Sequence, residues 1–153
     1  MIPASNEKII FEKTLKLSEL PVLFQVIDTL IQNNKRIFLL QGDLASGKTT
    51  LISHYIQYAI GDQSVSSPTF SLMHQHGDFF HYDLYHHGLD QFIEYGFLEN
   101  LDQGIHFIEW GDKNLSNILK NSRYNYSTIK IIKQENARHY RILTDEQAHC
   151  KKS

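Results

Sequence analysis

The sequence contains a single cysteine, Cys150, and no long hydrophobic run. One cysteine cannot form an internal disulfide, which indicates a chain that works in a reducing compartment. No segment reaches the roughly 20 consecutive apolar residues that a membrane-spanning helix requires. Residues Met1 to Lys8 also lack the basic and apolar regions of a signal peptide. We therefore expect a cytoplasmic protein with no membrane attachment.

An excess of basic charge is also absent. The 15 Lys and Arg residues and the 17 Asp and Glu residues give a net charge of −2, and the basic residues are scattered along the chain. Proteins that bind nucleic acid on their own usually carry a basic face, because neutralising phosphates supplies most of their affinity. A role in a nucleic-acid pathway would therefore run through partner proteins.

The length and composition fit one soluble domain. The chain has 153 residues, of which 41% are hydrophobic and 21% charged. These values are typical of a globular protein and leave little room for a second domain. There is no internal repeat and no linker rich in Pro, Gly or Ser. We expect one domain over residues 1–145, followed by a frayed tail at 146–153.

The hydrophobic pattern alternates between strands and helices along the chain. Short, fully apolar runs are typical of strands that are buried on both faces of a parallel sheet, and apolar residues at helical spacing predict amphipathic helices. The fold class is therefore α/β, with a mainly parallel central sheet flanked by helices and a C-terminal β-hairpin. Strands are expected at 9–17, 37–40, 69–75, 79–85 and 105–108, helices at 19–33, 50–60, 89–95 and 112–119, and the hairpin at 126–133 and 139–143.

A complete phosphate-binding loop, Gly-x-x-x-x-Gly-Lys-[Ser/Thr], lies between an expected strand and an expected helix. In such a P-loop the backbone N–H groups surround the phosphates, the lysine reaches the β- and γ-phosphates, and the Ser or Thr hydroxyl binds Mg²⁺. The alternative is a glycine-rich turn without chemistry, which the flanking strand and helix disfavour. The predicted nucleotide-binding residues of this segment are Gly42, Asp43, Leu44, Ala45, Ser46, Gly47, Lys48, Thr49 and Thr50.

A P-loop site also requires a carboxylate at the end of a neighbouring strand to hold the metal. Glu109 follows the mostly apolar run 105–108 and is the candidate, the alternative being a solvent-facing glutamate. Asp83 is a second strand acid that could orient water or metal, although it could also belong to a polar strand face. Thr69 lies on a loop that could sense the γ-phosphate. The alternative is that Ser-Ser-Pro-Thr is an ordinary turn sequence without such a role.

The nucleotide is predicted to be ATP. GTPases with this loop usually read guanine through an Asn/Thr-Lys-x-Asp segment, and nothing after residue 49 matches it. A small-molecule kinase is the enzyme alternative, but such kinases usually close an arginine-bearing lid over the phosphates. The four arginines are not clustered, so we expect neither a lid nor an arginine at the phosphates from this chain itself. They are Arg36, Arg123, Arg138 and Arg141.

Several histidines raise the question of a second metal site. His74 and His76 would share one strand face, an arrangement that two ligands of one metal require. With no cysteine nearby, scattered surface histidines are the favoured interpretation. The histidines concerned are His74, His76, His81, His86 and His87.

Four segments in this order resemble the TsaE (YjeE) family, the bacterial ATPases of tRNA threonylcarbamoyladenosine biosynthesis. The resemblance runs from about residue 36 to 115 and its motifs are highly specific. It implies a small P-loop α/β domain that works with two partner proteins, and reaches tRNA through them. The segments are Gly42 to Thr50, Ser67-Pro68-Thr69-Phe70, His81-Tyr82-Asp83-Leu84-Tyr85 and Ile108-Glu109-Trp110.

The resemblance also implies roles for individual residues, and the chain departs from the family pattern at three places. Lys48 and Thr49 would bind phosphate and Mg²⁺, Thr69 would lie in a switch-like loop, Asp83 at the catalytic centre, Glu109 on the metal and Trp110 beside the nucleotide. The departures are Ala45 in place of a glycine, His86 in place of an arginine, and Gly111-Asp112-Lys113 in place of a proline-containing stretch. Ala45 would be strained if that position needs a positive φ.

These observations favour an ATPase subunit of a tRNA-modifying machinery that uses ATP and Mg²⁺ and is slow without its partners. A nucleotide-gated binding module, in which hydrolysis is incidental, is a third interpretation. A metal-delivery GTPase is a distant fourth, because the guanine motif is missing.

Overall fold

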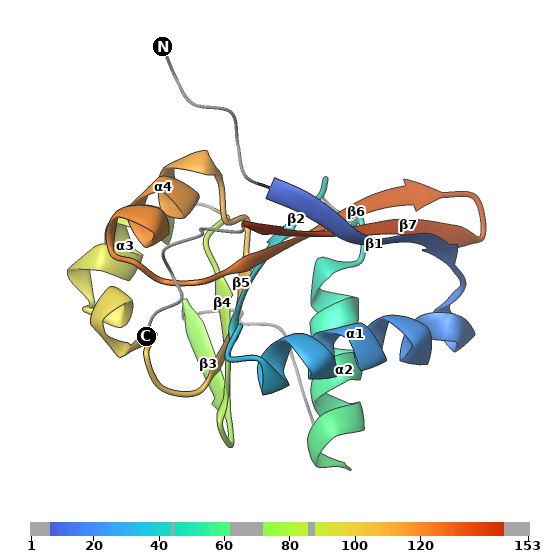
Figure 1. Cartoon of the computed structure of the whole chain (residues 1–153), viewed down its shortest axis with the longest axis horizontal. Coiled ribbons are helices and arrows are strands. Elements are labelled where there is room, and N and C mark those ends of the chain that lie inside the picture. Colours follow the sequence, from blue (N-terminus) through green and yellow to red (C-terminus); the bar gives the residue numbers. More distant parts are fainter. Residues whose placement is uncertain (1–6, 44, 62–71, 86–87, 146–153) are drawn as a thin grey trace.

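The computed structural model describes residues 7–43, 45–61, 72–85 and 88–145 (Figure 1). Within them the chain forms a seven-stranded sheet in the order β1-β7-β6-β2-β5-β4-β3. The strands are β1 (Glu7–Leu15), β2 (Ile37–Gln41), β3 (Met73–His76), β4 (Phe79–Asp83), β5 (Ile105–Glu109), β6 (Ser127–Gln134) and β7 (Ala137–Asp145). The helices are α1 (Leu20–Gln32), α2 (Lys48–Ile60), α3 (Gly88–Glu94) and α4 (Lys113–Asn121), with 3-10 turns at Leu17–Glu19 and Phe97–Asn100.

The predicted α/β fold is confirmed, including the C-terminal hairpin. The four central strands β6, β2, β5 and β4 run parallel to one another, whereas β1, β7 and β3 pair antiparallel towards the two edges. The sheet is therefore mixed, with its parallel part at the centre.

Some element boundaries differ from the predictions. The first strand covers 7–15 instead of 9–17, because Leu17 already begins a 3-10 turn. The predicted strand at 69–75 is shorter, with β3 at 73–76 and residues 69–71 outside the described part. The helix after the P-loop starts at Lys48 instead of Thr50, because the loop itself turns into the helix at Gly47.

Helices cover both faces of the sheet, which explains the unbroken apolar run of β2 (Figure 1). Phe38 and Leu40 point into a core shared with α1 and α2, whereas Ile37 and Leu39 point into the core beneath α3 and α4. Side chains of a strand alternate between the two faces, so a strand covered on both sides must be apolar at every position.

The hairpin of β6 and β7 lies against the P-loop. Its two-residue turn is Glu135-Asn136, with Asn136 in the left-handed region at φ 65°, a conformation that Asn adopts more readily than most residues. At Gly42 an added Cβ would lie 2.7 Å from the carbonyl oxygen of Ile131 on β6. Glycine is needed at this point of the loop because the hairpin backbone leaves no space for a side chain.

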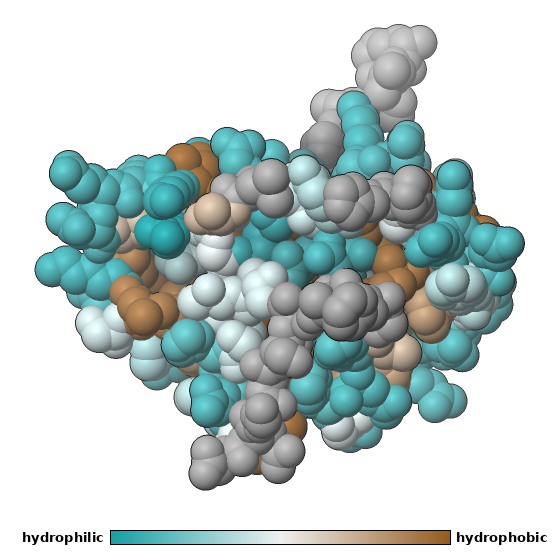
Figure 2. Space-filling model, turned by 180° about the vertical axis from the view of Figure 1, so that it is seen from behind, coloured by the Kyte–Doolittle hydropathy of each residue, from teal (hydrophilic) through white to brown (hydrophobic). Residues whose placement is uncertain are grey.

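The face of the molecule opposite to the view of Figure 1 is largely polar. Seen from behind, hydrophilic side chains cover most of it and hydrophobic ones form separate patches (Figure 2). None of the helices within the described residues is long and apolar enough to cross a membrane.

Candidate active site

A cavity of about 280 Å³ opens between the P-loop and the C-terminal ends of β4 and β5. It gathers loop residues with two acids, two bases and two aromatic side chains from separate parts of the sequence. The lining residues are Ala45, Gly47, Lys48, Thr49, Thr50, Asp83, Tyr85, Glu109, Trp110 and Arg138. Most of the predicted site residues that the structure describes therefore meet in one place.

The loop reaches its shape through two left-handed residues. Ala45 has φ 63° and Gly47 has φ 108°, and the Ser46 N–H donates to the Asp43 carbonyl at 3.0 Å. A left-handed conformation costs an L-residue about 1–2 kcal/mol, and glycine avoids this cost. The strain expected at Ala45 is therefore present in the loop.

Lys48 is almost fully buried at the centre of the loop, with 4% of its surface exposed. Its Nζ donates to the carbonyl oxygens of Gly42 at 2.8 Å and Asp43 at 2.9 Å, and it lies 3.9 Å from the centre of the Trp110 ring. Burial lowers the pKa of Lys48, while the charge of Glu109 opposes the shift. The ammonium group is thus held by two backbone carbonyls and an aromatic face. All of these partners are neutral, and phosphate oxygens could replace the carbonyls.

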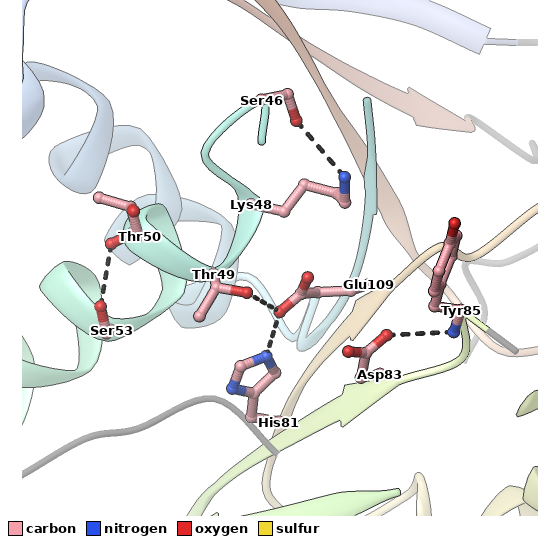
Figure 3. A network of polar contacts seen from close by, with 9 residues as sticks. All are labelled: Ser46, Lys48, Thr49, Thr50, Ser53, His81, Asp83, Tyr85 and Glu109. Carbon is pink, nitrogen blue, oxygen red and sulfur yellow. Dashed lines mark hydrogen bonds and ion pairs between the residues drawn. The ribbon is translucent and has the colours of Figure 1, made fainter. Parts of the chain in front are cut away.

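Thr49 and Glu109 form the part of the site that could hold a metal (Figure 3). The Thr49 hydroxyl donates to Glu109 Oε2 at 2.7 Å, and the same oxygen bonds His81 Nε2 at 2.5 Å. Glu109 is 3% exposed although it ends a strand, so the solvent-facing alternative is wrong. Mg²⁺ prefers oxygen ligands of these two kinds. The residues present therefore fit the ion.

His81 corrects one prediction, because it is not a surface histidine. It is completely buried and bonds Glu109. On β4 it stands two residues before Asp83, which pairs with Glu109 in the parallel register between β4 and β5. Residues two apart on a strand share a face, so His81 and Asp83 both point towards α2. His74 and His76 do share a face of β3, with ring centres 6.3 Å apart.

Asp83 lies beside Glu109 at the end of β4. Its Oδ1 accepts the backbone N–H of Tyr85 at 3.1 Å (Figure 3). Burial raises the pKa of the Asp83 carboxyl, and the nearby charge of Glu109 raises it further. The group is placed to accept a hydrogen bond from water in the cavity.

Two aromatic residues line the cavity together with Asp83 and Glu109. Tyr85 and Trp110 lie with ring centres 4.7 Å apart. Trp110 has φ 64°, and its backbone N–H donates to the carbonyl oxygen of Leu40 on β2 at 3.0 Å. This turn of the backbone directs the Trp110 ring back over the P-loop lysine.

Arg138 corrects another prediction, because an arginine of this chain does lie at the P-loop. It belongs to β7, and its Nε donates to the carbonyl oxygen of Ser46 at 2.8 Å. The sequence contained one usable signal for the position of Arg138, which is the short hairpin turn ending two residues before it at Asn136. It contained no sign that the hairpin lies over the P-loop.

Several positions named from the sequence lie outside the described part of the chain, so the proposals for them stay predictions. They are Leu44 of the P-loop, the segment Ser67-Pro68-Thr69-Phe70, His86, His87 and the expected tail at 146–153.

The chain is similar to proteins of one family. Residues 17–142 match the family described as Threonylcarbamoyl adenosine biosynthesis protein TsaE. The tRNA threonylcarbamoyladenosine biosynthesis protein TsaE of Rickettsia conorii is 36% identical over 107 residues, which are 66% of this chain and 57% of the relative. The protein of the same name from Rickettsia felis is 34% identical over 118 residues, 73% of this chain and 63% of the relative.

A solved structure has the same fold. Bacillus subtilis YdiB superimposes with a TM-score of 0.53 at 17% identity, over 91% of this chain and 88% of that one. The chain thus spans 57% and 63% of the lengths of the two Rickettsia relatives, and nearly the whole of the structural neighbour.

Proposed function

Since the chain belongs to the TsaE family, we propose that it binds ATP and hydrolyses it with Mg²⁺ to support threonylcarbamoylation of adenosine in tRNA. The observation that carries the proposal is the meeting of Lys48 with the Thr49–Glu109 pair in one cavity. A fixed cation beside a hydroxyl and a carboxylate is the combination that phosphoryl transfer with Mg²⁺ requires.

Each residue has a distinct part in this chemistry. Lys48 exchanges its carbonyl partners for the β- and γ-phosphates, and Thr49 and Glu109 hold Mg²⁺. The ion, when bound, neutralises charge that develops on the phosphate oxygens. Asp83 orients the attacking water, since it stands beside Glu109 and lines the cavity.

His81 is a positioning residue. Its Nε2 and the Thr49 hydroxyl bond the same oxygen of Glu109, and together they fix the direction of the carboxylate. Groups that orient a metal ligand from behind typically affect metal affinity and activity by 10- to 100-fold when they are removed.

The size and charge of the chain bear on whether it acts alone. The nucleotide fold uses the described residues almost entirely, and a net charge of −2 does not favour tight binding of tRNA by this chain alone. By the resemblance to the TsaE family, we propose that it acts with two partner proteins, that tRNA is reached through them, and that hydrolysis by the isolated chain is slow.

Reconstitution tests the proposal. The chain, the two partner proteins, ATP, Mg²⁺, tRNA and the threonylcarbamoyl donor are combined, and the modified nucleoside is measured by mass spectrometry over repeated turnovers. Lys48→Ala should abolish repeated product formation, whereas Lys13→Ala, an exposed lysine on edge strand β1, should not affect it. Equal product with Lys48→Ala would contradict the role of ATP.

Two further measurements separate the competing functions. ATP turnover is compared with and without the partner proteins. In a nucleotide-gated binding module, ATP turnover would not be stimulated by the partners in step with formation of the modified nucleoside. Rapid phosphorylation of a metabolite by the isolated chain would instead support the small-molecule kinase.

A further inference from the structure

The β6–β7 hairpin reaches the P-loop from the side opposite to the metal-binding carboxylate. The strand order β5-β2-β6-β7 places Glu109 on one side of β2 and the hairpin on the other. The hairpin contacts the loop at two points, Ile131 against Gly42 and Arg138 against Ser46. A side chain of β7 is therefore held at the phosphate cradle although more than 80 residues separate it from the loop along the chain.

The guanidinium of Arg138 lies over the loop. A Cβ added to Gly47 would be 3.5 Å from its Nε. Nε donates to the Ser46 carbonyl, and one Nη donates at 3.0 Å to the carbonyl of the neighbouring Ala137. An arginine has five N–H donors, and these two hydrogen bonds use only two of them. Arg138 also lines the cavity.

The charge of Arg138 is not neutralised by the rest of the described structure. Within residues 7–43, 45–61, 72–85 and 88–145 it forms no ion pair with a carboxylate. Arg141 on the same strand differs, because its Nη donates to Glu12 of β1 at 2.9 Å. A half-buried guanidinium with free donors and neutral partners is suited to an anion, and its planar geometry matches carboxylate and phosphate. Phosphate is the anion that the adjacent P-loop is built to bind.

We infer that Arg138 is a further nucleotide-binding residue, which contacts phosphate oxygens that face away from the metal and are shared by ADP and ATP. The inference rests on the proposed function, since it needs nucleotide in the P-loop. The contact strengthens binding of substrate and product alike, so it contributes to KM and leaves kcat unchanged.

A purely structural role is the competing explanation, because the bond to Ser46 could simply brace the loop. Arg138→Gln separates the two, since the amide can still donate to the Ser46 carbonyl but carries no charge. Arg138→Lys keeps the charge. Arg141→Gln is the matched control, as it removes a charge from the same strand away from the loop.

The affinities of these variants are measured by calorimetry with ADP, a non-hydrolysable ATP analogue and inorganic pyrophosphate, each with Mg²⁺. Arg138→Gln should weaken all three by about 10- to 100-fold, as expected for a hydrogen bond to a charged group. Arg138→Lys should restore most of the affinity, and Arg141→Gln should bind like the unaltered chain. In steady-state assays Arg138→Gln should raise KM at constant kcat.

Several outcomes would overturn the inference. Unchanged affinity of Arg138→Gln would show that Arg138 only braces the loop. Loss for ADP without loss for pyrophosphate would place Arg138 on the base or ribose, and loss confined to the ATP analogue would place it on the γ-phosphate. Lys48→Ala is measured in parallel: if it binds nucleotide normally, the proposed function fails, whereas normal binding by Arg138→Gln alone removes only this inference.

Discussion

The ammonium group of Lys48 lies 3.9 Å from the ring centre of Trp110, the single tryptophan of the chain. A cation over an indole face is an electrostatic contact, and it joins the phosphate-binding lysine to a natural fluorophore. Phosphates that draw Lys48 away from the loop carbonyls must therefore also change the surroundings of this ring.

Trp110 emission should change when Mg²⁺ and nucleotide bind, with a larger response to ATP than to GTP. The response should be lost in Lys48→Ala, because that variant lacks both the cation over the ring and the phosphate ligand. Titration followed by fluorescence, with Lys13→Ala as the control, measures it. A silent Trp110 in a chain shown by calorimetry to bind ATP would place the nucleotide elsewhere, and equal responses to both nucleotides would remove the argument for adenine.

Glu109→Gln should separate binding from hydrolysis. The amide keeps the shape of the side chain and can still accept the Thr49 hydroxyl hydrogen, but it removes the negative charge that holds Mg²⁺. ATP should bind at near-normal affinity without Mg²⁺, while Mg²⁺-dependent phosphate release falls by at least about 100-fold, a loss of some 2.7 kcal/mol in transition-state stabilisation.

The matched comparison is Asp83→Asn, on the neighbouring strand. It should lower the rate of phosphate release without altering the dependence of ATP binding on Mg²⁺ concentration. If Glu109→Gln hydrolyses ATP at the normal rate and Asp83→Asn loses its response to Mg²⁺, the two roles are exchanged.

Buried His106 should make folding stability depend on pH. Its Nδ1 is bonded to the Tyr82 hydroxyl at 2.8 Å and its Nε2 to the Gln103 carbonyl at 2.6 Å. Burial lowers the pKa of His106, although the bond to the Gln103 carbonyl and the charge of Asp102 oppose the shift. The unfolded chain takes up this proton near pH 6.5, before the folded chain does, so stability is complete above that pH and is lost as the pH falls below it.

Thermal unfolding from pH 7.5 to 5.0 measures this loss, which for one proton has a slope of up to about 1.4 kcal/mol per pH unit. His106→Gln should unfold with a smaller slope, even if its stability at pH 7.5 is lower. His54→Gln, an exposed position on α2, should keep the slope of the unaltered chain. An identical slope in His106→Gln would assign the pH dependence to other groups.

Local patterns were sufficient for much of the fold. The apolar run at 37–40 and the mostly apolar run at 105–108 predicted β2 and β5, because burial on both faces disfavours polar positions. His106 is the polar exception in β5, and both of its ring nitrogens are hydrogen-bonded. The same reasoning placed Glu109 at the end of a strand next to the P-loop. These features depend on neighbours within a few residues, which a sequence displays directly.

Contacts across strands were not predictable in the same way. His81 and Glu109 are bonded because β4 pairs with β5 in one particular register, and the alternating aromatic and polar residues of β4 do not specify it. Arg138 reaches Ser46 only because the hairpin lies over the P-loop. Both residues were misjudged from the sequence since their partners lie 28 and 92 positions away.

Ala45 offers a test of backbone strain in the P-loop. With φ 63° and an exposed side chain, it makes no packing contribution that would offset the cost of a left-handed conformation. Ala45→Gly should therefore raise the free energy of unfolding by about 1 kcal/mol, the relief of strain exceeding the extra entropy of glycine in the unfolded chain.

Ala59→Gly is the matched control, because Ala59 is exposed and lies in the last turn of α2. There the same change relieves no strain and should lower stability by roughly 0.5 kcal/mol. Urea unfolding at pH 7.5 without nucleotide gives both values. Opposite signs for the two alanines would show that Ala45 is strained in the folded protein, whereas destabilisation by both changes would show that the loop accommodates alanine without cost. Repeating the measurement with ATP and Mg²⁺ tests whether the strain matters for function. If the strain is the same with and without nucleotide, Ala45→Gly leaves ATP affinity unchanged. A tenfold loss of ATP affinity in Ala45→Gly would mean that the strained loop is better organised for phosphate than the relaxed one.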